Sequence, residues 1–233
     1  MTQLSILTMT TLLCVAVLGT TNANAADFRF SGIEVPSCDK LRGESICIAL
    51  SLTGKIELGD TAKLLRQVEL AESSISKSIA PARVALLFLE SPGGSMSEAM
   101  ALGRLIRGRQ ISTQVAKGDT CASSCVLILA GGVKRVPAGN IVIHSFYSPE
   151  ILGTNDFAKA EKLYTQVANE VSAYLKDVRI SSLLLDEMMR IPHVKSRQLE
   201  LEELIKLGLL GIDPVYAQAR SNPPSSAFTS DKK

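Results

Sequence analysis

Blocks of apolar and polar residues follow one another through the middle of the chain and predict alternating strands and helices. Residues 84–89 form an unbroken apolar run, as expected for a strand covered on both faces of a parallel sheet. From Asp60 to Lys77 the apolar residues recur at helical spacing, and Ala80-Pro81 ends that helix. The same reading predicts further strands over 28–35, 46–52, 111–116 and 141–144, and helices over 97–107 and 123–130. Successive βα units of this kind favour right-handed parallel crossovers.

The pattern becomes mainly helical after residue 144. Apolar spacing predicts helices over 156–176, 182–190 and 200–207, the last ended by Gly208. Residues 212–216 are predicted as a last short strand, and the polar, proline-containing end as a disordered tail.

The two ends of the chain set the expected domain limits. Residues 4–18 are predominantly apolar and too short for a comfortable membrane span, and Ala23-Asn24-Ala25 follows as a small-x-small cleavage site. We therefore expect a signal peptide over 1–25, one compact domain over 26–217 and a tail over 218–233. This predicts a periplasmic or secreted protein, with an uncleaved membrane anchor as the alternative.

Composition describes an ordinary globular protein and excludes some classes of partner. The 25 basic and 23 acidic residues nearly balance, which gives no electrostatic footprint for nucleic acid. The chain has two histidines, neither near a cysteine in sequence, so no metal site is predicted.

Four cysteines remain once Cys14 leaves with the signal peptide, an even number suited to an oxidising compartment. Cys38 and Cys47 flank a polar turn that a disulfide would close. Cys121 and Cys125 are four residues apart, which on one helical turn separates their Cα atoms by about 6 Å, within disulfide range. The alternative is that all four are buried thiols.

Candidate chemistry lies at two short turns that follow apolar runs. Gly93 and Gly94 would let the backbone approach a substrate closely, and amides at the start of the next helix would face a developing oxyanion. Ser123 is expected at a helix start, where the amide of Ser124 faces the same point as Gly94. The alternatives are an ordinary turn and a helix-capping serine.

His144 ends an apolar strand, so its ring would project from the carboxyl edge of the sheet, where ligands bind in open α/β folds. It follows the candidate nucleophile in the chain and is a candidate general base.

Several ordered motifs together resemble the proteolytic subunit of the Clp protease, ClpP, in the ClpP/crotonase superfamily. The resemblance spans residues 46–213 and includes Leu52-Thr53-Gly54, Ser91-Pro92-Gly93-Gly94, Ala122-Ser123, Ile143-His144 and the stretch 202–209. It implies an α/β fold, a crotonase-like spiral of ββα units in a single domain. It also implies peptide hydrolysis by Ser123 and His144, with an oxyanion hole from Gly93, Gly94 and Ser124.

The sequence departs from that family at the third catalytic residue, an aspartate. Aligning the chain with the family pattern without gaps forward from His144 places His193 at the aspartate position. Aligning it backward from Gly208 places Ser196 there instead. Neither residue is a carboxylate. His193 would then orient His144 through a neutral ring nitrogen. If the helix over 182–190 is shifted relative to the family pattern, Asp186 or Glu187 would take this role instead. The cysteine pair around Ser123 also has no counterpart in the cytoplasmic enzyme.

The sequence thus predicts an exported, ATP-independent serine peptidase that needs no cofactor. Its expected partners are peptide or unfolded-protein substrates and further copies of the chain in a homo-oligomer, with no ATPase. Two alternatives stay open: a non-catalytic relative that binds peptides or acts as a scaffold, and a crotonase-type enzyme acting on acyl thioesters.

Overall fold

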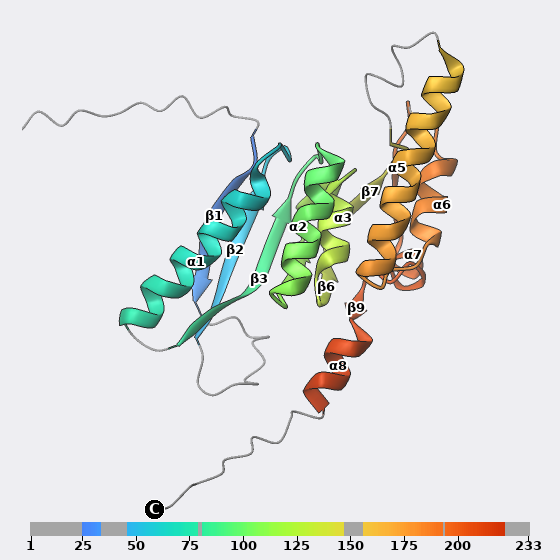
Figure 1. The fold of residues 1–233 in the computed structure, drawn as a ribbon. Helices are drawn as coiled ribbons and strands as arrows, with labels where there is room; N and C mark the ends of the chain where they lie inside the picture. The colour runs from blue at the N-terminus through green and yellow to red at the C-terminus, as the bar shows by residue number, and fades with distance from the viewer. Residues whose placement is uncertain (1–24, 34–45, 79–80, 147–155, 193, 222–233) are drawn as a thin grey trace, which may run out of the picture.

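The computed structural model describes residues 25–33, 46–78, 81–146, 156–192 and 194–221 (Figure 1). The strands are β1 (Asp27–Ile33), β2 (Ile46–Thr53), β3 (Ala82–Glu90), β4 (Ser112–Val115), β5 (Thr120–Ala122), β6 (Lys134–Pro137), β7 (Asn140–Ile143), β8 (Arg197–Gln198) and β9 (Gly211–Ile212). The helices are α1 (Asp60–Ser78), α2 (Met96–Gly108), α3 (Cys125–Gly131), α5 (Phe157–Asp177), α6 (Leu183–Arg190), α7 (Leu201–Lys206) and α8 (Pro214–Ser221). Most of the predicted signal peptide and tail therefore lies outside the described residues.

Two sheets organise these elements. The larger has the strand order β1-β2-β3-β4-β6-β9, in which the four central strands are parallel and the two edge strands antiparallel. The smaller has the order β5-β7-β8, with β5 and β7 parallel. Parallel neighbours joined through helices define an α/β fold, so the predicted fold class is confirmed.

Helices α1, α2 and α3 lie side by side along the larger sheet (Figure 1). The side chains of β2 that face this layer, Ile48, Leu50 and Leu52, are at most 1% exposed. Helix α3 is buried along its whole length, which explains its unbroken apolar sequence. The packed helices thereby fix the loops at the carboxyl ends of the parallel strands.

Two contacts fasten the C-terminal helices to this core. The Tyr174 hydroxyl of α5 donates a hydrogen bond of 2.6 Å to the Leu127 carbonyl of α3. Gly103 of α2 makes room for it, because a Cβ there would lie 1.8 Å from the Tyr174 hydroxyl oxygen. Arg107 of α2 forms a 2.7 Å ion pair with Asp213, which precedes α8.

The last predicted strand, over 212–216, is wrong beyond Ile212. Pro214 opens α8, and the Asp213 carboxylate accepts the Tyr216 N–H at 2.9 Å, so an N-terminal capping arrangement begins where strand continuation was expected. Helix α8 continues to Ser221, inside the stretch predicted as a tail. No helix among the described residues is long and apolar enough to cross a membrane.

Candidate functional site

Ser123 lies in a tight turn between β5 and α3, in a left-handed backbone conformation with a φ of +58°. The other described non-glycine residues with positive φ, Gln110 and Arg179, follow the C-termini of α2 and α5, where such a conformation is common. Ser123 instead precedes a helix, and its N–H donates to the Val142 carbonyl at 2.9 Å. The sequence predicted Ser123 inside a helix from residue 123, but α3 begins two residues later because this turn intervenes.

The Gly93-Gly94 turn packs directly against Ser123. A Cβ on Gly93 would lie 2.6 Å from the Ser123 Cβ, and one on Gly94 would lie 2.1 Å from the Ile56 carbonyl oxygen. Both glycines also have positive φ, +94° and +147°. Only glycine satisfies both the conformation and the close approach, so this turn is built to bring its backbone against the serine.

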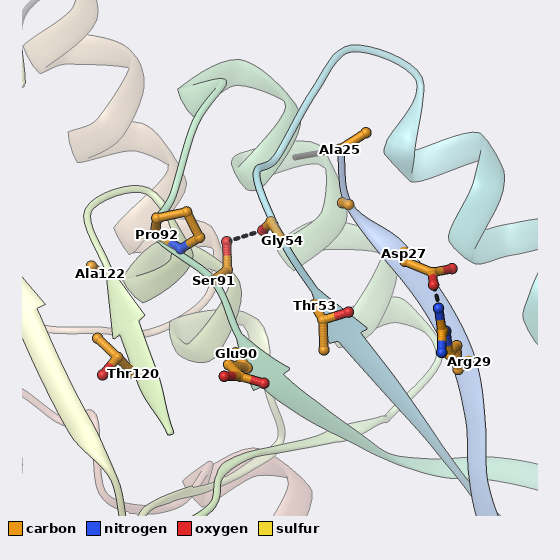
Figure 2. A pocket seen from close by; sticks show the side chains of 11 residues that line it. Ala25, Asp27, Arg29, Thr53, Gly54, Glu90, Ser91, Pro92, Thr120 and Ala122 are labelled. Carbon is orange, nitrogen blue, oxygen red and sulfur yellow. Dashed lines mark hydrogen bonds and ion pairs between the residues drawn. The ribbon is translucent and has the colours of Figure 1, made fainter. Parts of the chain in front are cut away.

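Some backbone N–H groups of the Gly93-Gly94 turn and the Ser123 turn already donate hydrogen bonds, and others do not. The Gly93 N–H donates to Ser91 Oγ at 3.1 Å, and Ser91 Oγ donates to the Gly54 carbonyl at 2.6 Å (Figure 2). Within the described part of the chain, the N–H groups of Gly94 and Ser124 have no acceptor. Of the three predicted oxyanion donors, these two are thus available, while Gly93 provides close packing.

His144 directly follows β7, at the carboxyl edge of the smaller sheet. Its Nδ1 lies 2.6 Å from the Ser145 carbonyl oxygen. A carbonyl oxygen only accepts, so in the neutral ring the proton is assigned to Nδ1 and Nε2 is in its acceptor form. That is the tautomer a general base requires.

The register of β5 and β7 brings Ser123 and His144 to one end of the smaller sheet. Ala122 pairs with Val142 across these parallel strands, so Ser123 and His144 leave the sheet at the same edge. Among the described residues, the Ser123 hydroxyl makes no hydrogen bond, and therefore none to His144. Hydrogen bonds between a nucleophile and its base are often long or unformed before substrate binds.

A disulfide joins Cys121 and Cys125, with their Cα atoms 5.3 Å apart. This agrees with the predicted pairing, but the reason differs. Cys121 lies on β5 and Cys125 is the first residue of α3, so the bridge spans the turn of Ser123 rather than one turn of helix. Cys47 is also disulfide-bonded, and its predicted partner Cys38 lies outside the described residues.

The predicted orienting residues are not brought to His144 by the described part of the chain. His193 lies outside the described residues, while Ser196 and Asp186 are exposed. The Glu187 carboxylate accepts from Arg190 at 2.8 Å and Arg197 at 3.1 Å. Sequence reasoning missed the Ser145 carbonyl, because no residue type signals a backbone contact of this kind.

A cavity of about 810 Å³ opens at the carboxyl ends of β2 and β3, beside the Ser91-Pro92 turn (Figure 2). Register pairs place Asp27, Thr53 and Glu90 in a row across β1, β2 and β3, along this cavity. Ala122, which precedes Ser123, also lines the cavity, whereas neither Ser123 nor His144 is among its lining residues. Among the described residues, no three histidine, cysteine, aspartate or glutamate side chains gather as metal ligands.

Comparison with solved structures finds chains of similar fold. A mutant of ClpP1 from Listeria monocytogenes matches with a TM-score of 0.46 and 14% identity, covering 70% of this chain and 88% of that chain. A mutant of the membrane-bound stomatin-specific protease 1510-N matches with a TM-score of 0.42 and 18% identity, covering 75% and 83%. No family model and no curated protein sequence matches the chain.

Proposed function

We propose that this chain is a serine hydrolase that cleaves peptides, with Ser123 as nucleophile and His144 as general base. The observation that carries the proposal is the left-handed conformation of Ser123 in a strand-to-helix turn, with Gly93 pressed against it. A non-glycine residue held in this conformation is strained, and such strain persists at functional sites that the surrounding structure over-determines. A serine presented on a sharp turn after a strand is also the arrangement of a nucleophile elbow.

Each step of acyl transfer can be assigned to a group of this site. His144 Nε2 takes the proton of Ser123 Oγ as that oxygen attacks the scissile carbonyl carbon. The carbonyl oxygen becomes an oxyanion that accepts from the Gly94 and Ser124 N–H groups. His144 then gives its proton to the leaving amine, and water releases the acyl group by the reverse sequence.

The Ser145 carbonyl takes the orienting role in this mechanism. It holds the tautomer of His144 through Nδ1, and its dipole stabilises the imidazolium that forms. A neutral carbonyl stabilises that cation less than a carboxylate does.

The substrates we propose are peptides or unfolded chains that enter the cavity at the carboxyl edge of β2 and β3. We further propose that the protein acts outside the cytoplasm, without ATP or an ATPase partner, as a homo-oligomer. These parts rest on the N-terminal sequence and on the family resemblance.

A non-catalytic, peptide-binding role is the second candidate. The observation in its favour is that the Ser123 hydroxyl makes no hydrogen bond with any of the described residues, so no base is engaged with it in this structure. Such a protein would use the same cavity but would not activate Ser123.

Labelling with a fluorophosphonate probe separates the two candidates. We expect the oxidised, mature protein to be labelled at Ser123, and both Ser123→Ala and His144→Ala to abolish the label. Ser74→Ala, an exposed position on α1, is the matched control and should label like the wild type. Absence of label on a folded wild type would favour the binding role.

A further inference from the structure

We propose that the Cys121–Cys125 disulfide is a clamp that positions Ser123, so that reactivity of the nucleophile depends on the oxidation state of this pair. The proposal rests on the proposed hydrolase function for its effect on activity. Its structural part, that the bridge holds the strained turn, stands on the geometry alone. Cys121 and Cys125 are positioning residues, because they act through the turn and do not touch a substrate.

The two ends of the clamp are anchored in different parts of the core. Cys121 lies on β5, which pairs with Ile141 of β7 and bridges to Ser91. The Ala122 N–H donates to the Ser91 carbonyl, and the Ser91 N–H donates to the Thr120 carbonyl, each at 2.9 Å. Cys125 begins the buried helix α3, and both cysteines are 0% exposed. The bridge therefore ties a fixed strand to a fixed helix across the three residues between them.

The segment held between these anchors is the one with an unfavourable backbone. A left-handed conformation is disfavoured for serine because its Cβ crowds the following carbonyl. Ser123 itself is restrained by the bond from its N–H to the Val142 carbonyl, by the Val126 N–H that its carbonyl accepts at 3.1 Å, and by the packing of Gly93 on one side. Opening the bridge removes a covalent restraint and allows the turn to relax toward an ordinary conformation, moving the hydroxyl and the Ser124 amide together.

The short loop argues that the bridge acts locally. A disulfide stabilises a fold more when it closes a longer loop, and this one has a sequence separation of only 4. Its expected contribution to global stability is therefore small for a disulfide. Because it spans the turn, the bridge holds in place the candidate nucleophile Ser123 and the candidate oxyanion donor Ser124.

Reduction is an ordinary thiol–disulfide exchange. An external dithiol attacks one sulfur, the Cys121–Cys125 bond breaks, the two cysteines become thiols, and the dithiol is oxidised to its own disulfide. Because both sulfurs are buried, the attacking thiolate reaches them only when the turn opens.

The test compares oxidised wild type, wild type reduced with dithiothreitol, and the variant Cys121→Ala/Cys125→Ala. The variant keeps Cys47 and its bridge, so an effect common to reduction and to the variant belongs to the Cys121–Cys125 pair. Two rates are measured: fluorophosphonate labelling of Ser123, and amide hydrogen exchange at Ser123 with the β3 amides as an internal reference. Alkylation of free thiols followed by mass spectrometry verifies the oxidation state of each sample.

We expect labelling to fall by about tenfold or more in the reduced and variant proteins, as for a nucleophile that is no longer held in place. We expect the Ser123 amide to exchange about tenfold faster while the β3 amides keep their protection. Reoxidation should restore labelling in the wild type, and the variant should not respond to dithiothreitol.

Unchanged exchange at Ser123 in both the reduced and the variant protein would overturn the clamp, whatever the labelling shows. If the oxidised wild type carries no label at all, the hydrolase function fails, and the exchange measurement still decides whether the bridge holds the turn. The reduced wild type serves as a second route to the open bridge should the double variant fold poorly.

Discussion

Gly93 and Ser123 are in direct backbone-to-side-chain contact, although thirty positions of sequence and the elements α2, β4 and β5 separate them. A Cβ on Gly93 would lie 2.6 Å from the Ser123 Cβ and 2.7 Å from the Ala122 carbonyl oxygen. Both atoms belong to the strained turn, which is also restrained by backbone hydrogen bonds, among them that to Val142, and by the disulfide. The glycine therefore sets the position of the serine.

We expect Gly93→Ala to abolish most reactivity of Ser123. The added methyl group must displace the serine turn, and its own φ of +94° is unfavourable for alanine. A displacement of the nucleophile by about 1 Å lowers rates by about 100-fold, and backbone strain should lower the free energy of unfolding by about 1–3 kcal/mol. Fluorophosphonate labelling and urea denaturation measure the two effects.

Gly108→Ala is the matched control for this substitution. Gly108 ends α2, and a Cβ there would meet nothing within 4 Å. Its labelling rate should equal that of the wild type, with stability changed by no more than about 0.5 kcal/mol. Equal behaviour of the two alanine variants would show that Gly93 does not set the serine position.

The conformation of Ser123 predicts opposite effects of one substitution on stability and activity. Ser123→Gly removes the proposed nucleophile but accepts a φ of +58° without steric strain, whereas Ser123→Ala removes the same hydroxyl and keeps the strain. The glycine variant should be more stable than the alanine variant by about 1 kcal/mol, and neither should label. Chemical denaturation of the two side by side measures this difference; an alanine variant as stable as the glycine variant would contradict a strained serine.

The sequence predicted the long elements well because their signals are local. The helix over 60–77 and the strand over 84–89 each carry a repeated apolar pattern, and both are present with slightly wider limits as α1 and β3. The short strands β5, β6 and β8 were not predicted, because their sequences contain no apolar run that sets them apart from the loops around them. Their pairing depends on tertiary contacts.

The sequence suggested the residues of the candidate site but not their geometry. Ser123, His144 and Gly94 were identified from turn chemistry and chain order. The positive φ of Ser123 and the contact from His144 Nδ1 to the Ser145 carbonyl depend on how distant segments pack, and no residue type encodes them. The strand predicted over 212–216 was wrong because the prediction followed the apolar residues and overlooked Asp213-Pro214, a pair that typically starts a helix.

Removing the Tyr174 hydroxyl should loosen the docking of α5 on α3. Tyr174 is 0% exposed and donates to the Leu127 carbonyl at 2.6 Å, and burial raises the pKa of the phenol so that it stays a donor at neutral pH. We expect Tyr174→Phe to lower the free energy of unfolding by about 1 kcal/mol. Tyr164→Phe is the control, since that ring stacks on Phe146 and its hydroxyl makes no hydrogen bond with the described residues. Equal losses in both variants would refute a role for the bond.

Asp213 joins three parts of the fold through one buried carboxylate. It is 2% exposed, forms ion pairs with Arg107 at 2.7 Å and Arg179 at 3.5 Å, and accepts the Tyr216 N–H at 2.9 Å. Burial disfavours its charged form, but the Tyr216 hydrogen bond and the two arginines outweigh burial and hold its pKa below the ordinary value of 3.8. The folded state therefore binds a proton less readily than the unfolded chain.

This pKa shift makes stability depend on acid in a defined direction. When the pKa of a carboxyl is lower in the folded protein than in the unfolded chain, its ionised form stabilises the fold. This stabilisation is fully present at pH values above the unfolded-state pKa and is lost as the pH falls through the folded-state pKa. Asp213→Asn keeps a side-chain oxygen for the Tyr216 N–H but leaves Arg107 without its buried counter-charge, at a cost of about 3 kcal/mol at neutral pH. The difference from wild type should shrink as pH falls below about 4.

Urea denaturation of wild type and Asp213→Asn from about pH 7 to about pH 3 measures this dependence. The control is Asp177→Asn at the end of α5, because the pair of Asp177 with Arg104 is half exposed and should contribute less than about 0.5 kcal/mol at any of these pH values. A difference between wild type and Asp213→Asn that stays constant across the range would mean that the Asp213 charge does not hold α8 against α2. A difference that closes in acid, with no such closing for Asp177→Asn, would assign the acid sensitivity of this junction to one buried carboxylate.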